Sequence, residues 1–382
     1  MTYRLFGTPA SLYTAKARSY LIKQRIDFEN MAAGAPYFRD VILPKVGRWI
    51  IPVLECPDGT LVQDSSEIIE YFDAQGNTRY QTYPSTAVHR LIGRIFELFG
   101  GEGLLRPAMH YRWNFDDTNL TFLERDFPAA LANPGASPDV NKGIYALASQ
   151  RMRKAMASFG VSRATAPAIE ASYEEFLQLM DTHLEGSPYL LGGSPTIGDY
   201  CLIAPLYAHL ARDPFPSVLM KRKALRVWRW VERMNAPDRD CGEYGDITMD
   251  LFKDDGVPES LKNLLRFIAE DYLPEIEAFV GFTNDWLKAH SDIKPGTSGL
   301  PRRQDRVIGQ VEFIWRDHPV RVAVIPYRLH LLQKIQAVVD QASRSEQDRM
   351  YMLLNETGLS KLLELRTTRR VVRKNHLEVW SE

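Results

Sequence analysis

Three hydroxyl-bearing residues lie where the first predicted strand gives way to the first predicted helix. A short strand is expected over residues 3–6, the turn Gly7-Thr8-Pro9 follows, and a helix should begin near Ser11. Ser11, Tyr13 and Thr14 therefore stand at the N-terminal end of that helix, where free backbone N–H groups favour a negative charge. No cysteine occurs at this corner, so its hydroxyls are suited to polarising the thiol of a ligand rather than to supplying a thiol.

The chemical task at such a corner is to ionise a thiol. A free thiol with a pKa of about 8.5 is only about 3% thiolate at pH 7. A hydroxyl hydrogen bond and the positive end of a helix together contribute one to two pKa units, on the order of 2 kcal/mol. Ser11, Tyr13 and Thr14 are each candidates for this hydroxyl, and Ser11 also suits a helix N-cap.

A second stretch, IPVLECPDGTLVQDSSEIIEYF over residues 51–72, predicts strand, hairpin, strand and helix. Pro52 cannot donate a hydrogen bond within a strand, and we expect a cis peptide bond between Ile51 and Pro52. Such a turn leaves backbone polar groups near Ile51 free for a ligand. Asp64 and Ser65 precede the next helix, whose free N–H groups suit a carboxylate, and the whole stretch is suited to gripping a small extended peptide. Asp64 and Ser65 also suit a plain helix cap.

This stretch resembles the cis-proline and acid-serine segment of the glutathione S-transferase superfamily. The resemblance continues in LFGTPASLYTAKAR and in YLLGGSPTIGDYCLIAPLYAHL, and it covers roughly residues 3–235. It implies that the backbone of Ile51 pairs with the cysteinyl part of glutathione, and that Asp64 and Ser65 receive its γ-glutamyl end. It also implies that Ser11, in the place of the family's serine, stabilises the thiolate, with Tyr13 as the second candidate.

The partner of the glycine carboxylate of glutathione is less evident. The family often has Lys or Gln immediately before the residue that precedes the proline, whereas this chain has Ile50. Arg39, Lys45 and Arg48 are close enough in sequence to substitute, and we take Arg48 as the candidate glutathione-binding cation.

A candidate co-substrate pocket follows the first helix of the second predicted domain. Met109, His110, Tyr111 and Trp113 supply the polarizable and aromatic side chains that an apolar co-substrate needs beside a thiolate. Ordinary packing between domains explains them equally well, and His110 is given no catalytic role. Further on, Thr196 and Asp199 form a capping box before an apolar helix, so Asp199 is expected to serve folding rather than chemistry.

Composition excludes several other classes of protein. The chain has 382 residues, 45% of them hydrophobic, and a formal net charge of −1, so no generally basic nucleic-acid surface is indicated. Its three cysteines are too scattered for a disulfide framework, and no Cys/His cluster has metal-ligand spacing. No apolar run is long enough to span a bilayer, and a cytoplasmic location is expected. The basic run over 366–374 is interpreted as the solvated face of a strand pair.

We therefore expect an α/β thioredoxin-like N-terminal domain, an all-α helical domain and a mixed α+β C-terminal extension. Their expected ranges are 1–78, 86–240 and 241–382. Residues 114–164 are the least regular part of the helical domain, with loops at 133–135 and 137–138. In the extension, helices are expected within 261–290, 327–339 and 347–354, and hairpins over 311–325 and 370–380.

The resemblance implies a glutathione S-transferase, that is, an enzyme transferring alkyl or aryl groups other than methyl, active in detoxification. Its partners would be glutathione, as substrate, and a small hydrophobic electrophile; no metal, nucleic acid or membrane is expected, and a homodimer is implied. The alternative is a non-catalytic, glutathione-binding protein that acts as an interaction module through its extension.

Overall fold

A four-stranded sheet forms the N-terminal unit in the computed structural model, which describes residues 2–76, 78–133 and 135–382. Its strands are β1 (Tyr3–Gly7), β2 (Phe28–Ala32), β3 (Val53–Glu55) and β4 (Leu61–Gln63). They run in the order β2-β1-β3-β4, with β1 parallel to β2 and antiparallel to β3, and β3 antiparallel to β4. The helices of this unit are α1 (Leu12–Lys23), α2 (Leu43–Val46) and α3 (Ser65–Asp73). The predicted thioredoxin-like fold and the cis peptide bond between Ile51 and Pro52 are confirmed.

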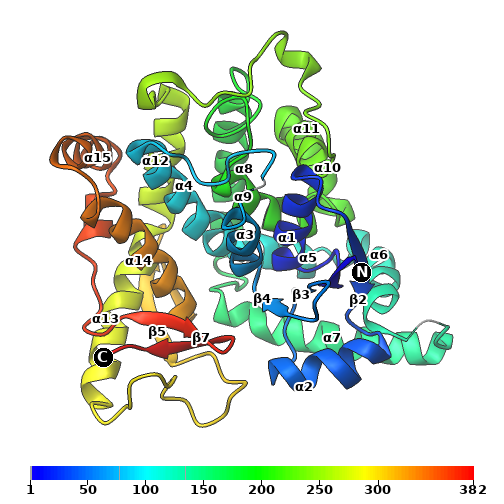
Figure 1. Cartoon of the computed structure of the whole chain (residues 1–382). Helices are drawn as coiled ribbons and strands as arrows, with labels where there is room; N and C mark the ends of the chain where they lie inside the picture. The colour runs from blue at the N-terminus through cyan, green and yellow to red at the C-terminus, as the bar shows by residue number, and fades with distance from the viewer. Residues whose placement is uncertain (1, 77, 134) are drawn as a thin grey trace.

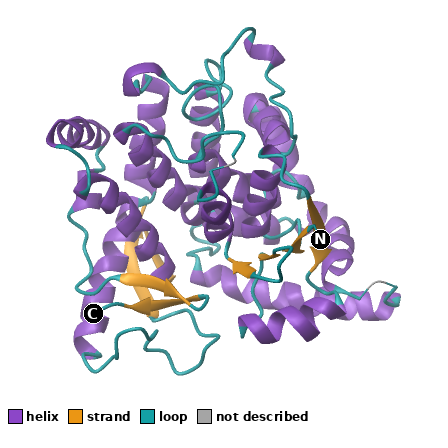
Figure 2. Cartoon of the chain, viewed as in Figure 1, coloured by secondary structure: helices purple, strands orange, loops and turns teal. Residues whose placement is uncertain are grey.

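The second unit is entirely helical (Figures 1 and 2). Its helices are α4 (Ala87–Leu98), α5 (Leu105–Trp113), α6 (Asp116–Leu131), α7 (Pro138–Ala155), α8 (Ala166–His183), α9 (Ile197–Ala208), α10 (Pro214–Lys223) and α11 (Leu225–Met234). The expectation of irregular structure over 114–164 is wrong, because α6 and α7 occupy most of that range. Both helices have many exposed polar residues, which obscured their periodicity. Of the predicted loop at 133–135, residue 134 lies outside the described residues.

The C-terminal extension is mixed, as predicted. Its elements are α12 (Glu259–Asp271), α13 (Leu273–Ala289), β5 (Gly309–Trp315), β6 (His318–Val324), α14 (Pro326–Asp340), α15 (Arg344–Thr357), β7 (Val371–Lys374) and β8 (Leu377–Trp380). Two separate hairpins, β5–β6 and β7–β8, are therefore present where the sequence predicts them. Tyr272 separates α12 from α13, which divides the single helical stretch expected over 261–290.

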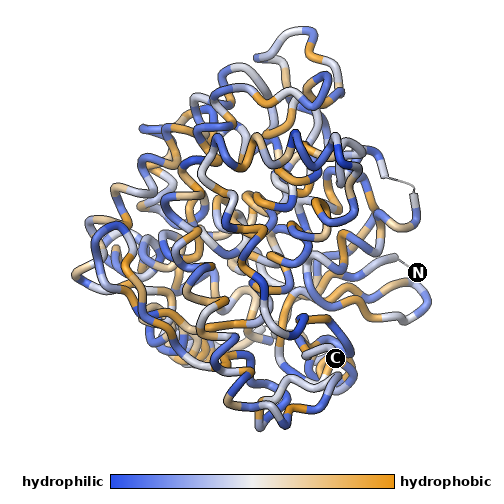
Figure 3. Tube along the Cα trace, turned by 90° about the vertical axis from the view of Figure 1, so that its left-hand side faces the viewer, coloured by the Kyte–Doolittle hydropathy of each residue, from blue (hydrophilic) through white to orange (hydrophobic). Residues whose placement is uncertain are grey.

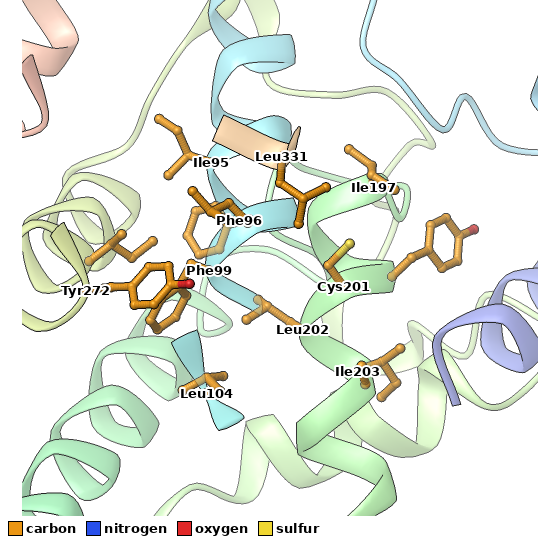
Figure 4. Close-up of a cluster of buried hydrophobic side chains, with 14 of the residues drawn as sticks. Ile95, Phe96, Phe99, Leu104, Ile197, Cys201, Leu202, Ile203, Tyr272 and Leu331 are labelled. Carbon is orange, nitrogen blue, oxygen red and sulfur yellow. The ribbon is translucent and has the colours of Figure 1, made fainter. Parts of the chain in front are cut away.

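One continuous core joins the helical unit to the extension. Figure 4 shows Phe96 of α4, Cys201 and Leu202 of α9, Tyr272, and Leu331 of α14 around the same buried space. The chain after α4 passes so close to α9 that a Cβ at Gly100 would lie 2.7 Å from the backbone nitrogen of Leu202. Hydrophobic and hydrophilic residues alternate along most of the helices, as expected where each helix buries one face (Figure 3).

Asp199 stabilises the start of α9, as the sequence predicts. Its carboxylate accepts hydrogen bonds from the backbone N–H of Leu190 and Thr196 and from the indole of Trp230, at 2.9–3.2 Å. Burial raises the pKa of Asp199 to about 6, against the effect of these donors. A carboxylate with every oxygen engaged in this way is structural.

A chain of buried charges crosses from the helical unit into the extension. Arg106 donates to Glu275 at 2.6 Å, and Arg328 donates to Glu102 at 3.0 Å and also to Glu275. The four side chains are 3–5% exposed. Each charge is costly to bury alone, so the arrangement is stable only with all of its members in place.

None of the helices in the described part of the chain is both long and apolar enough to cross a membrane.

Glu275→Gln should destabilise the fold strongly, because the amide neutralises neither Arg106 nor Arg328. The expected loss is about 3–5 kcal/mol in the free energy of unfolding, the usual cost of breaking a buried ion pair. Urea unfolding followed by circular dichroism measures it. Glu277→Gln is the matched control, because Glu277 stands on the same helix and pairs with Lys361 at the surface. Equal stabilities of the two variants would contradict a structural role of the buried charges.

Candidate functional site

Strand register brings the predicted site residues to one edge of the sheet. Phe6 near the end of β1 pairs with Val53 at the start of β3, and Val53 pairs with Gln63 at the end of β4. The segment that follows β1, the segment that precedes β3 and the segment that follows β4 therefore meet at that edge. Ser11, Ile51 and Asp64 belong to these three segments.

Ser11 is the N-cap residue of α1. Its Oγ accepts a hydrogen bond of 3.4 Å from the backbone N–H of Thr14, and its side chain is half-buried. Among the described residues, nothing accepts the proton of the Ser11 hydroxyl. The capping interpretation and the catalytic interpretation are thus compatible, because capping uses a lone pair and thiolate stabilisation uses the proton.

Tyr13 has its proton committed elsewhere. Its hydroxyl donates to Oε1 of Glu102 at 2.8 Å. Burial and the carboxylate of Glu102 raise the pKa of Tyr13 well above its ordinary value, while Arg306 and Arg328 oppose the rise. Tyr13 is therefore a neutral donor to a buried carboxylate, with no second proton to offer a ligand.

Ile51 presents an open backbone. The β1–β3 ladder begins at Val53, and among the described residues neither the N–H nor the C=O of Ile51 makes a hydrogen bond. Its side chain is half-buried, whereas Pro52 is buried. An extended ligand can pair with Ile51 as a further strand would.

Asp64 and Ser65 form the N-terminus of α3. Asp64 has a φ of +95°, a backbone conformation that is rare outside glycine and typical of functional sites, and its Oδ1 accepts from the N–H of Ser66 at 2.8 Å. Burial alone would raise the pKa of Asp64, but Arg373 and Lys16 lower it below its ordinary value, so the group is ionised. Ser65 is fully buried, and its Oγ has no hydrogen-bond partner among the described residues.

Residues of the extension surround this pair, which the sequence did not predict. Tyr327 of α14 donates to Asp64 at 3.1 Å. Arg373 of β7 donates to Gln63 at 3.0 Å and to Glu67 at 2.5 Å, and its side chain is 7% exposed. The interpretation of the basic run over 366–374 as a solvated face is therefore wrong for Arg373. The β7–β8 hairpin lies on the side of the extension that faces β4 (Figure 1).

Arg48 is the one of the three candidate cations that points inward. Arg39 pairs with its neighbour Asp40 at the surface, and Lys45 is exposed. The Arg48 side chain is 3% exposed and donates to the carbonyl of His376 at 2.6 Å. Its Nε and Nη1 have no hydrogen-bond partner among the described residues.

Burial lowers the pKa of Arg48 to about 10, and Arg306 adds to this shift while Glu378 opposes it. The charge of Arg48 is thus incompletely compensated. Its two free donors make it suitable for binding an anion.

The four candidate co-substrate residues divide between two sides of α5. Met109 and Trp113 share a hydrophobic cluster with Ala10, next to Ser11. His110 pairs with Glu170 at 2.9 Å, and Tyr111 stacks on Phe115. All four are at most 5% exposed, and their role as a co-substrate pocket stays a prediction. Within the described ranges, no three His, Cys, Asp or Glu side chains are placed to share a metal ion.

Two family models match the chain. Residues 5–79 match the model described as glutathione S-transferase, N-terminal domain, and residues 163–233 match that described as glutathione S-transferase, C-terminal domain. No curated protein matches the sequence.

The solved structures that are similar to this chain include the following three. The β-etherase LigF from Sphingobium sp. strain SYK-6 is 17% identical, with 64% of this chain and 98% of that chain covered and a TM-score of 0.43. The transferase GSTFuA3 from Phanerochaete chrysosporium is 14% identical, with coverages of 62% and 98% and a TM-score of 0.43. A transferase from Methylobacterium radiotolerans in complex with glutathione sulfonate is 17% identical, with coverages of 68% and 100% and a TM-score of 0.36.

The thioredoxin-like unit that carries the cis-proline and the helical second unit each match a glutathione S-transferase model, so these two units are glutathione S-transferase domains.

Proposed function

We propose that the protein is a glutathione transferase in which Ser11 stabilises the thiolate of bound glutathione. The observation that carries this proposal is the uncommitted proton of the Ser11 hydroxyl at the N-terminus of α1. It stands at the sheet edge where Ile51 offers a free N–H and C=O. A thiol brought to this edge meets both a hydroxyl donor and the positive end of a helix, which favour its ionised form.

Glutathione is held at its cysteinyl part and at its γ-glutamyl end. The backbone of Ile51 pairs with the cysteinyl part. The carboxylate of the γ-glutamyl end accepts from Ser65 and the first N–H groups of α3, and its ammonium group pairs with the ionised Asp64. The unpartnered Oγ of Ser65 supports this placement, because a buried hydroxyl without a partner is costly until a ligand supplies one.

The thiolate then attacks an electrophilic carbon of an apolar or aromatic co-substrate. A C–S bond forms, and the leaving group departs with the electron pair of the bond that breaks. Met109 and Trp113 are the best placed of the α5 residues to contact this compound, because they pack beside Ala10. Action in detoxification, a cytoplasmic location and a homodimer stay predictions from the family resemblance.

Ser11→Ala should lower turnover mainly at neutral and acidic pH. Loss of the hydroxyl raises the pKa of the bound thiol by one to two units, so kcat/KM should fall about 10- to 100-fold wherever the pH lies below both pKa values. Above both values the thiol is ionised in either protein, and the difference should vanish. The measurement is the pH profile of kcat/KM with an activated aryl chloride.

Tyr13→Phe is the matched variant, and it should keep most of the activity because the Tyr13 proton is held by Glu102. The opposite pattern, with Tyr13→Phe impaired and Ser11→Ala active, would transfer the activating role to Tyr13 and contradict the assignment of Ser11.

Binding of glutathione should release a proton near neutral pH, because the bound thiol ionises while the free thiol does not. Calorimetric titrations at about pH 6 and about pH 8, in buffers of different ionisation enthalpy, measure the release. S-methylglutathione is the control ligand, since it has no thiol proton. Undetectable binding of both ligands by the native protein would reject the enzyme and favour an interaction module built on the extension.

A further inference from the structure

A cavity of about 610 Å³ lies where the chain between the first two units meets α15 of the extension. Its wall is formed by residues between 79 and 89, Ser194, the segment 249–255, and Glu346 and Arg349 of α15. Backbone hydrogen bonds hold the segment 249–255 in place, because Gly193 donates to Asp250 and Phe252 donates to Leu191, both at 2.9 Å. The volume is within the range of cavities that bind small molecules.

The wall of this cavity carries more negative than positive charge. Four carboxylates and two guanidinium groups line it, those of Asp250, Asp254, Asp255, Glu346, Arg79 and Arg349. Asp255 pairs with Arg349 at 3.2 Å, whereas the side chains of Asp250 and Asp254 have no partner among the described residues. Such a wall favours a ligand with positive charge.

His89 adds a buried acceptor to the same wall. Its side chain is 2% exposed, and its Nε2 lies 3.0 Å from the carbonyl oxygen of Gly256. Because a carbonyl oxygen only accepts, Nε2 carries the proton, and Nδ1 of the neutral ring has a free lone pair. Nδ1 lies 3.8 Å from Oδ1 of Asp255, which is also an acceptor, and it has no hydrogen-bond partner among the described residues. The two atoms are spaced so that one ammonium group can donate to both.

The carboxylate of Asp255 is fixed in this position by its backbone. Asp254 and Asp255 have φ values of +55° and +57°, which are uncommon for residues other than glycine. Asp255 accepts from the backbone N–H of His89 at 3.4 Å, at the start of α4. Thr86, the N-cap residue of α4, makes no capping hydrogen bond with its side chain, so Asp255 caps this helix from the extension.

We propose that this cavity binds a di- or polyamine. One primary ammonium group lies between Nδ1 of His89 and Oδ1 of Asp255 and donates to both. A second ammonium group lies near the unpaired carboxylates of Asp250 and Asp254, and Phe252 contributes apolar surface for the methylene groups between the charges. A metal ion is less suited, because within the described ranges no three His, Cys, Asp or Glu side chains are placed to share one. The lining residues differ from those of the candidate glutathione site, so the inference does not depend on the proposed function.

The test is a calorimetric titration of the full-length protein with spermidine and with fully quaternised spermidine, which keeps the positive charges but has no N–H donor. The native protein should bind spermidine saturably and about 10-fold or more tightly than the quaternised analogue, because only spermidine makes charge-assisted hydrogen bonds. Asp254→Asn should weaken the binding of spermidine about 2- to 5-fold, the usual effect of losing an exposed ion pair. Asp246→Asn is the matched control and should leave binding unchanged, since Asp246 is exposed three residues before the segment 249–255 and does not line the cavity.

His89→Phe removes the buried acceptor, and it should abolish the preference for spermidine over the analogue, with circular dichroism to verify that the variant is folded. If this variant does not fold, the ligand preference of the native protein and the comparison of the two Asp variants still decide. Equal binding of the two ligands by the native protein would overturn the inference and indicate that His89 pairs directly with Asp255. Absence of saturable binding, or an equal loss in Asp254→Asn and Asp246→Asn, would also overturn it, and each of these results would leave the proposed function standing.

Discussion

The buried charges of Glu102, Arg106, Glu275 and Arg328 are the constraint on which the rest of the structure depends. Two of them come from the helical unit and two from the extension, so each unit neutralises charges that the other buries. This series of buried ion pairs also reaches the N-terminal unit, because Glu102 accepts a hydrogen bond from the hydroxyl of Tyr13. Separating the extension from the first two units would leave these charges without their partners, at a cost of several kcal/mol for each ion. The extension is therefore integral to the fold.

A second set of polar contacts joins the three units at the start of α3. Tyr327 donates to Asp64, while Lys16 donates to Ser66, whose hydroxyl in turn donates to Glu97 at 3.1 Å. Side chains from all three units thus hold the turn in which Asp64 keeps its positive φ. A strained backbone persists only where its surroundings determine it in this way. The acid-serine turn lies in the matched N-terminal domain, but one of the side chains that hold it, Tyr327, comes from the extension.

Sequence patterns predicted the features that depend on neighbouring residues. They did not predict the side-chain pairs between residues far apart in sequence. The cis bond at Pro52, the cap at Asp199 and both hairpins of the extension follow from residues within a few positions of one another. Arg373 was misjudged because its partners Gln63 and Glu67 lie about 300 residues away in sequence. A charged residue in a predicted hairpin gives no signal of which distant carboxylate it meets. The available hint was that Arg373 and Glu378 stand opposite each other in the β7–β8 hairpin, because such a cross-strand pair indicates that Arg373 has a charged partner.

Long-range contacts also bear on the choice between the two candidate hydroxyls of Ser11 and Tyr13. Ser11 and Tyr13 stand two positions apart on one helix, and each has the proton that thiolate stabilisation needs. What separates them is Glu102, 89 residues beyond Tyr13, which accepts the phenolic proton and is held in place by Arg328 of the extension. If the Tyr13 hydroxyl donated to a thiolate instead, the buried carboxylate of Glu102 would lose a donor, and this cost would offset the free energy of the new hydrogen bond. Ser11 accepts a hydrogen bond from the helix and keeps its proton, so the buried ion pairs that stabilise the fold also favour Ser11 over Tyr13 in the proposed function.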